Sequence, residues 1–449
     1  MRQRLVRTAL VGGVAVLVLL LALATCGGPE EAAGGDVDRR PGDTSAPAAP
    51  GTAAAPATRL PVPAAYDTGR GWELPDVPDS YVVARAAGRI AWLEPVGAAR
   101  YRLRTVDAAT GTAAWTGRAW RPLGTSGDGS GVAPRLLTVA KDDREFFVTW
   151  SYGRTGDGPL TATEPFVSLD VYDAADGVRR RVEVPWPAVP TVTGTGPGVL
   201  IGDGRTTTAV VDPVTGAVTR VPPARLGRPA KCADCGRLTE VRAVTPKGLL
   251  VSGARGFWVP GAWFSGNRAP AGADPASGRP VSVTPGHVLA RWQPEKGSRR
   301  AATHDVWAVH DVVTGRPLVR VECHRPALEP GAHPEAVVSP GGRYLIAGRL
   351  AFDLDESAGR CFEDRDGGRP LTLTTVTDEG VVYGAAGARD VPDALAGGGS
   401  PVLVRPATGT VEALAPNVRL PAADVAGVGL FRWTDARDRP YLIAYRRHG

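Results

Sequence analysis

Five cysteines have the best-defined chemistry in this 449-residue chain. Cys232 and Cys235 form a C-x-x-C motif, a spacing found in zinc half-sites and in redox dithiols. A zinc site needs two further ligands, but the sequence has neither a second C-x-x-C nor a nearby pair of histidines. A redox dithiol of the thioredoxin type would need alternating strands and helices, a pattern this sequence lacks. The motif therefore favours a structural disulfide.

Cys323 and Cys361 follow comparable turns in two successive units of the chain. If Cys26 is used for lipid, as argued below, these four cysteines are an even set in an oxidising compartment. We expect a second disulfide between Cys323 and Cys361, which requires their Cα atoms to lie roughly 4.4 to 6.8 Å apart.

The histidines do not form a recognisable site. His304 and His310 flank the segment HDVWAVH and share one face of a strand, but that strand separates them by about 20 Å. The others show no chelating or catalytic spacing: His287, His324, His333 and His448. We assign no catalytic, cofactor-binding or metal-binding residue and expect no cofactor.

The first 26 residues carry an export signal. Three arginines precede an uncharged apolar segment from Thr8 to Thr25. Leu23-Ala24-Thr25-Cys26 resembles a bacterial lipobox, whose cysteine is diacylated, although Thr25 departs from the usual small residue. Cleavage after Ala24 and an uncut signal anchor are the alternatives. We expect the cell membrane, extracytoplasmic face, as the location, with secretion as the alternative.

Residues 27–63 are rich in Pro, Ala and Gly and contain few large apolar side chains. Such a stretch cannot offset its ordering entropy of about 1 to 2 kcal/mol per residue, so we expect a disordered linker. Residues 64–449 form the remaining domain. Its short apolar runs and many turns predict an all-β fold.

One turn recurs along this domain. In VVDPVTGAVTRV, Asp212 is followed by Thr215 and Gly216 between two apolar runs. Asp caps backbone N–H groups and Gly supplies a positive φ. Related stretches place the same residue types at Asp107, Thr110, Gly111 and Trp115, and at Asp311, Thr314 and Gly315. Many of the turn acids lie near 40 residues apart or at multiples of that spacing, which is typical of β-propeller blades.

This repeat predicts a β-propeller of about seven four-stranded blades, with eight as the alternative. We expect the segment from Val428 to Arg447 to complete its last blade with N-terminal strands around Tyr81 to Pro95. For Trp258 and Trp263, packing between blades is favoured over a loop at the propeller mouth.

TVDAATGTAAW, with Asp107, Thr110, Gly111 and Trp115, resembles the tryptophan-docking motif of quinoprotein-like propellers. Other units keep only part of it, because Arg220, Val319 and Ala413 stand where the tryptophan would be. Members of the family include quinone-dependent dehydrogenases and cofactor-free envelope lipoproteins. The enzymes carry adjacent cysteines against the quinone, whereas no two cysteines are adjacent here.

Composition narrows the range of partners. The net charge is +6, but the arginines alternate with acids rather than forming a basic stripe, which argues against nucleic acid. The preference for Arg over Lys is typical of a GC-rich genome such as an actinobacterial one. We expect a monomeric, membrane-anchored module that binds or scaffolds an envelope protein, peptide or glycan. A hydrolase or lyase with its site in the central funnel is the alternative.

Overall fold

The computed structural model describes residues 56–97, 99–123, 134–154, 164–230, 232–326, 333, 335–363 and 369–448. The chain divides into a unit of residues 1–50 and a unit of residues 51–449, and the fold below is that of the second unit. The candidate lipidation site Cys26 lies outside the described residues. Among those described, no helix has the length and apolar character needed to cross a bilayer.

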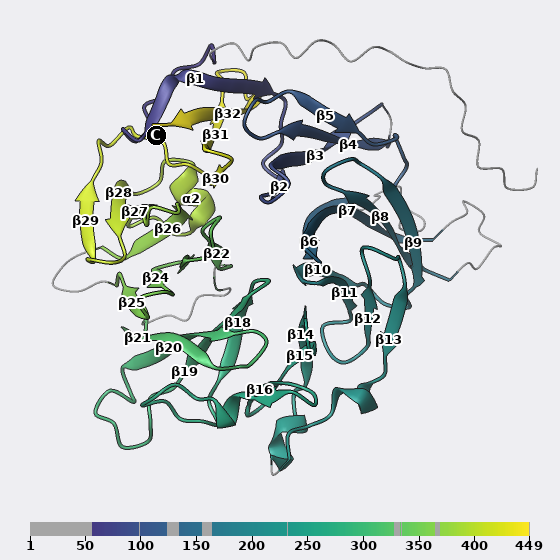
Figure 1. Cartoon of the computed structure of the whole chain (residues 1–449), viewed down its shortest axis with the longest axis vertical. Coiled ribbons are helices and arrows are strands. Elements are labelled where there is room, and N and C mark those ends of the chain that lie inside the picture. Colours follow the sequence, from purple (N-terminus) through teal and green to yellow (C-terminus); the bar gives the residue numbers. More distant parts are fainter. Residues whose placement is uncertain are drawn as a thin grey trace, which may run out of the picture. The chain divides into compact units, whose positions relative to one another are not determined.

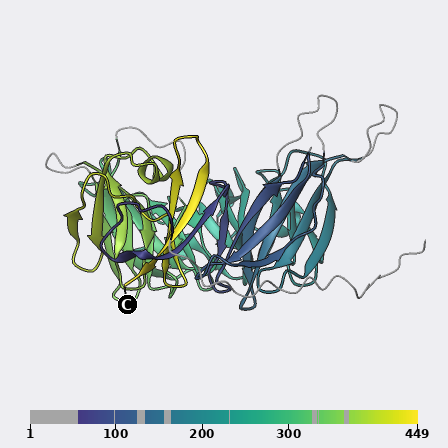
Figure 2. The same ribbon diagram turned by 90° about the horizontal axis from the view of Figure 1, so that it is seen from above.

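Eight antiparallel sheets of four strands each follow one another around a ring (Figure 1). The chain is therefore an all-β, eight-bladed propeller, and eight rather than seven is the blade number. Figure 1 places first strands such as β6, β10 and β18 toward the centre, and fourth strands such as β9 and β13 at the rim. Figure 2 shows the blades from the side.

The first four blades use consecutive strands. Blade 1 contains β2 (Val82–Ala84), β3 (Arg89–Pro95), β4 (Tyr101–Asp107) and β5 (Ala113–Thr116); blade 2 contains β6 (Arg135–Lys141), β7 (Arg144–Gly153), β8 (Phe166–Asp173) and β9 (Arg179–Pro185). Blade 3 contains β10 (Thr191–Gly196), β11 (Gly198–Gly202), β12 (Thr208–Val211) and β13 (Val218–Val221); blade 4 contains β14 (Glu240–Thr245), β15 (Gly248–Gly253), β16 (Gly256–Val259) and β17 (Trp263–Phe264).

Blades 5 to 7 also use consecutive strands, whereas blade 8 combines the last three strands with β1. Blade 5 contains β18 (Arg279–Val283), β19 (His287–Trp292), β20 (His304–Asp311) and β21 (Pro317–His324); blade 6 contains β22 (Val337–Val338), β23 (Tyr344–Ala347), β24 (Leu350–Asp353) and β25 (Ala358–Cys361). Blade 7 contains β26 (Leu371–Val376), β27 (Val382–Ala386), β28 (Ser400–Arg405) and β29 (Thr410–Ala413); blade 8 contains β30 (Ala423–Val425), β31 (Val428–Thr434), β32 (Pro440–Arg447) and β1 (Tyr66–Pro75). Short helical turns interrupt the strands at η1 (Pro223–Leu226), η2 (Ala233–Gly236), η3 (Ser265–Asn267) and α2 (Val391–Leu395).

The core lies between neighbouring blades. Strand β8 reads FVSLDVYD and is buried at nearly every position, because both faces of its sheet are covered. One apolar cluster joins Val148 and Leu169 of blade 2 to Ile201 and Val211 of blade 3. Burying each such side chain contributes roughly 1.5 to 3 kcal/mol, so a blade is stabilised mainly by its neighbours.

Ring closure differs from the expected one. Strand β1 pairs with β32, from Tyr66 opposite Arg447 to Pro75 opposite Tyr441. The last blade is thus completed by residues 66–75, while the strands around Tyr81 to Pro95 open blade 1. The prediction of strands around Tyr81 to Pro95 is confirmed, but a strand-forming sequence does not specify the pairing partner.

The segment 58–63 also departs from the linker expectation, and we call it the strap. The Leu60 backbone N–H donates to Tyr445 Oη over 2.9 Å, and that hydroxyl donates to the Thr58 carbonyl over 2.8 Å. Thr58 N–H in turn donates to Glu73. Leu60 is buried beside Phe431 and Tyr445. The strap therefore belongs to the propeller, because one buried leucine and its hydrogen bonds fix residues whose composition resembles a linker.

Candidate functional site

The turns between the first and second strands of the blades, which we call the inner hairpins, surround the centre of the ring. Three of them share the sequence Val-(Thr/Ser)-Pro, in which proline fixes one turn dihedral and the hydroxyl bonds to the turn backbone. Thr245 Oγ1 accepts from Lys247 N–H over 3.2 Å and donates to the Gly248 carbonyl over 2.8 Å. This second repeat was missed in the sequence, and its signal is the shared residue types rather than the spacing: Thr245-Pro246, Thr284-Pro285 and Ser339-Pro340.

The inner hairpin of blade 2 is charged instead. Lys141 pairs with Arg144 across a two-residue turn made by Asp142 and Asp143. Both aspartates have left-handed backbones, with φ of 51° and 58°, a conformation that suits a tight hairpin. Both are exposed, and neither carboxylate has a hydrogen bond or ion pair with any residue in the described part of the chain.

The neighbouring charges are already matched. Lys141 Nζ lies 2.5 Å from Asp212 Oδ2 of blade 3, and Arg144 contacts Asp173. Burial by itself would raise the pKa of Asp212, but the bond from Lys141 and those from backbone N–H groups hold it below its usual value. Glu145 accepts from the backbone N–H of Arg85, which joins blades 1 and 2.

These hairpins line a cavity of about 900 Å³. One wall is the charged hairpin of residues 141–145, and another is formed by Pro197, Pro246 and Pro285 from three successive blades. Ala86 of blade 1 and the outer turn of blade 3 complete the lining. A cavity of this size can take a small ligand or several residues of an extended chain. The cavity thus presents an apolar, proline-rich surface beside the two carboxylates of Asp142 and Asp143, which are unpaired in the part of the chain that the structure describes.

The residues of the repeated turn motif lie in the turns between third and fourth strands of blades. In each, Asp accepts from the N–H of Thr, and the N–H of Gly donates to the carbonyl of Asp. The N–H distances to the Asp carboxylate are 3.0, 3.1 and 2.7 Å for Thr110, Thr215 and Thr314. Gly111, Gly216 and Gly315 have φ of 69°, 75° and 68°. They build turns, and only Asp212 also lines the cavity.

Trp115 docks between blades rather than within its own unit. Its Nε1 donates to the Ala174 carbonyl of blade 2 over 3.1 Å, and its ring covers Gly177. Trp72 of blade 8 makes the same contact with Ala108 and Gly111 of blade 1. In both contacts a tryptophan on the outermost strand of one blade rests on the outer turn of the following blade.

Arginine replaces tryptophan in two of these contacts, a substitution that the sequence analysis did not anticipate. Arg180 of blade 2 lies over Gly216 of blade 3, and its guanidinium donates to the Thr215 carbonyl over 2.8 Å. Arg360 of blade 6 reaches Gly409 and the Pro406 carbonyl of blade 7. A planar guanidinium, like an indole, offers a flat face and an N–H donor.

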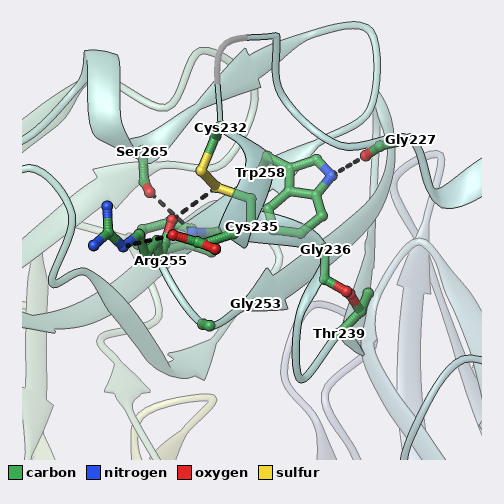
Figure 3. The surroundings of a disulfide bond; sticks show 12 residues. Gly227, Cys232, Cys235, Gly236, Thr239, Gly253, Arg255, Trp258 and Ser265 are labelled. Atoms are coloured by element: carbon green, nitrogen blue, oxygen red, sulfur yellow. Dashed lines mark hydrogen bonds and ion pairs between the residues drawn. A yellow bond between two sulfur atoms is a disulfide. The ribbon is translucent and has the colours of Figure 1, made fainter.

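The Cys232–Cys235 disulfide has a Cα separation of 5.4 Å and closes η2 against the hairpin of β15 and β16 (Figure 3). Cys235 is fully buried, and its carbonyl would lie 2.0 Å from a Cβ at Gly253. Trp258 covers this region and donates from Nε1 to the Leu226 carbonyl over 3.1 Å. The disulfide closes the turn of η2, while the buried Cys235 and Trp258 pack the segment between β13 and β14 onto blade 4.

The second disulfide joins Cys323 of blade 5 to Cys361 of blade 6, with Cα atoms 5.8 Å apart. It therefore crosses a blade boundary. Trp263 also crosses one, since its Nε1 donates to the Val312 carbonyl of blade 5 over 3.2 Å and its ring covers Gly315. Trp258 and Trp263 are both buried, in agreement with a packing role.

No protein-family model and no curated protein matches this chain. Among solved structures, the Dos1 propeller aligns with 84% of this chain and 95% of its own, at 7% identity and a TM-score of 0.42. BamB from Moraxella catarrhalis aligns with 83% of this chain and 96% of its own, at 12% identity and a TM-score of 0.31. The class of protein, an eight-bladed β-propeller, rests on the eight sheets themselves.

Proposed function

We propose that this protein is a membrane-anchored, extracytoplasmic propeller that binds a polypeptide partner at its inner hairpins. A rigid ring that presents turns around a centre suits binding or scaffolding, since recognition needs only positioned turns. The partner segment is extended and carries lysine or arginine.

The cavity of about 900 Å³ between the inner hairpins carries this proposal. Its walls come from five blades, so its shape is fixed by the ring rather than by one mobile loop. Three prolines give a wall without backbone N–H donors, which favours contact with apolar or imino-acid side chains.

Charge selects the partner. Asp142 and Asp143 are exposed and unpaired within the described chain, whereas Lys141, Arg144 and Glu145 are each engaged. The protein as a whole has a net charge of +6, so this negative hairpin differs from its average surface. A cationic side chain would gain from both carboxylates, and this attraction should weaken as salt increases.

The envelope location is supported by residues 1–26, where arginines precede an apolar segment ending at Cys26. Two disulfides are consistent with an oxidising compartment, in which such bonds persist.

Photo-crosslinking in the intact envelope tests the binding surface. A crosslinking residue at position 143 should capture a polypeptide, and Asp142→Asn with Asp143→Asn should lower binding of that partner at least about tenfold at low salt. Position 438 supplies the matched control, because Asp438 is an exposed, left-handed turn residue between β31 and β32 of blade 8. Equal capture from both positions, or capture of carbohydrate alone, would overturn the proposal.

Membrane extraction of full-length Cys26→Ser protein tests the anchor separately. A diacylated cysteine predicts release of this variant into the soluble fraction, because two acyl chains supply the stable attachment. A variant that stays fully membrane-bound indicates an uncut signal anchor and rules out lipid attachment as the anchor.

A further inference from the structure

Two histidines that are far apart in the sequence face each other in blade 5. Strand β20 begins at His304 and β21 ends at His324, and the two residues are directly paired across the strands. Their ring centres lie 5.1 Å apart, with the ring planes inclined by 68°. His324 is exposed and His304 is half-buried. The pair is therefore open to solvent at one end of the blade.

Hydrogen bonds occupy Nδ1 of both rings, which leaves Nε2 as the nitrogen that can bind a ligand. His324 Nδ1 lies 3.0 Å from the Arg325 carbonyl, which can only accept, so the neutral ring carries its proton on Nδ1. His304 Nδ1 lies 2.8 Å from Thr303 Oγ1, which can accept in the same way. Neither Nε2 has a hydrogen-bond partner among the residues that the structure describes. Metal-binding histidines are held by the same type of bond from the second nitrogen.

The ring spacing also matches a metal site. With metal–nitrogen bonds of about 2.0 to 2.1 Å, a ring centre lies about 3.2 Å from the ion, and two rings at a tetrahedral angle have centres about 5.2 Å apart. The separation between His304 and His324 is 5.1 Å.

The surroundings balance the nearby positive charge. The Arg325 guanidinium is bonded to the buried carboxylate of Asp305, with an N–O distance of 3.0 Å. Arg349 donates to the His324 carbonyl, while the Glu363 carboxylate accepts from the His324 backbone N–H. An added cation would thus meet no uncompensated cluster of like charge.

A covalent bond holds the pair in place. Cys323, the residue before His324, is bonded to Cys361 of blade 6, so the end of β21 is held to the neighbouring blade. Glu363 and the two sulfurs have ligand atoms within 4.8 Å of one another, but the sulfurs are consumed by the disulfide. The sulfurs are therefore not available as ligands, and the two imidazoles supply the nitrogen ligands at this end of the blade.

We propose that His304 and His324 bind one divalent transition-metal ion of the Zn²⁺, Ni²⁺ and Cu²⁺ class through their Nε2 atoms. Imidazole nitrogen is a preferred ligand of these ions. Water occupies the remaining coordination positions. This site is on the end of blade 5 and is independent of the proposed partner-binding cavity.

Titration of the full-length protein, purified without a histidine tag, with ZnCl₂ by calorimetry tests the site. We expect one ion per chain, with binding that weakens in acid because metal binding competes with protons for the ligand atoms. His304→Asn and His324→Asn should each weaken binding by at least the about tenfold seen for loss of a supporting residue at metal sites. His448→Asn is the matched control, since His448 is exposed on another blade.

Two further measurements distinguish loss of the metal ligands from a folding defect in the variants. Bound Cu²⁺ should show nitrogen hyperfine coupling in electron paramagnetic resonance that disappears in the double variant. The metal-free variants should keep the thermal midpoint of the parent protein, and His324→Asn alone is sufficient if His304→Asn folds poorly. Zn²⁺ binding that survives in the double variant, or no binding at 1 mM Zn²⁺ to the parent, would overturn the proposal.

Discussion

His310 is a titratable side chain with no exposed surface. It is fully buried in blade 5, where its ring lies 5.7 Å from Phe257 and 5.6 Å from Trp292. Nδ1 lies 3.0 Å from the Gly315 carbonyl, so the neutral ring donates to the turn. Burial lowers the pKa of His310 to about 4, although the bond to Gly315 acts in the opposite direction. The residue therefore serves as a neutral donor that supports the outer turn.

Stability should depend on pH through this group. An unfolded chain binds a proton at His310 below about pH 6.5, whereas the folded chain binds it only below about pH 4, so acid favours unfolding in that window. The stability advantage of the parent protein over His310→Phe should fall by about 3 kcal/mol between pH 7 and pH 4. Urea unfolding at several pH values measures it. Parallel stability curves for the two proteins would contradict the expectation.

Strands of neighbouring blades are joined by flat side chains resting on glycine. Trp72, Trp115 and Trp263 use an indole, and Arg180 and Arg360 use a guanidinium, each reaching the outer turn of the following blade. At Gly111, Gly177 and Gly315 the glycine is required twice, once for its positive φ and once because a Cβ would lie 2.5 or 2.6 Å from the indole ring. Each outer turn is thus part of an interface between blades.

Two glycine substitutions separate the requirement for a positive φ from the requirement for space beneath the ring. A Cβ at Gly315 would lie 2.5 Å from Cδ2 of Trp263, while at Gly427, which has φ of 75°, it would meet nothing within 4 Å. Gly427→Ala should cost about 1 to 2 kcal/mol from backbone strain alone. Gly315→Ala should cost about 1 to 3 kcal/mol more, because the indole must move. Denaturant unfolding measures both, and equal losses would show that the docking contact adds nothing.

Closure of the ring depends on the strap and on strand β1, which together span residues 58–75. Strand β1 completes blade 8 by pairing with β32. The strap of residues 58–63 is bonded to Tyr445 of β32. Tyr445 ties these parts together, because its buried hydroxyl bonds to both Leu60 and Thr58.

Removing that hydroxyl should weaken the closure. Tyr445→Phe leaves the Leu60 N–H without its partner and should cost about 1 to 3 kcal/mol. Tyr441→Phe, on the same strand, removes only a long contact of 3.5 Å to Asp435 and should cost less than about 0.5 kcal/mol. Thermal unfolding compares the two variants. Similar midpoints for both would exclude a closing role for the Tyr445 hydroxyl.

The local structure of this protein follows from short-range patterns of residues. Turns such as Asp212 to Gly216 require an acid, a hydroxyl and a glycine at fixed spacing, and their recurrence predicts four-stranded blades, because both features act within a few residues. The sequence also carries the Val-(Thr/Ser)-Pro tripeptide, which recurs with shared residue types at unequal intervals.

Only the tertiary structure decided which distant residues meet. The pairing of β1 with β32, the docking of Arg180 on Gly216 and the approach of His304 to His324 each join positions that local patterns do not relate. The number of blades depends on the same long-range fit, because a ring closes only when every interface between blades is filled. Side-chain alternation fixes which face of a strand is buried, and packing fixes what lies against it.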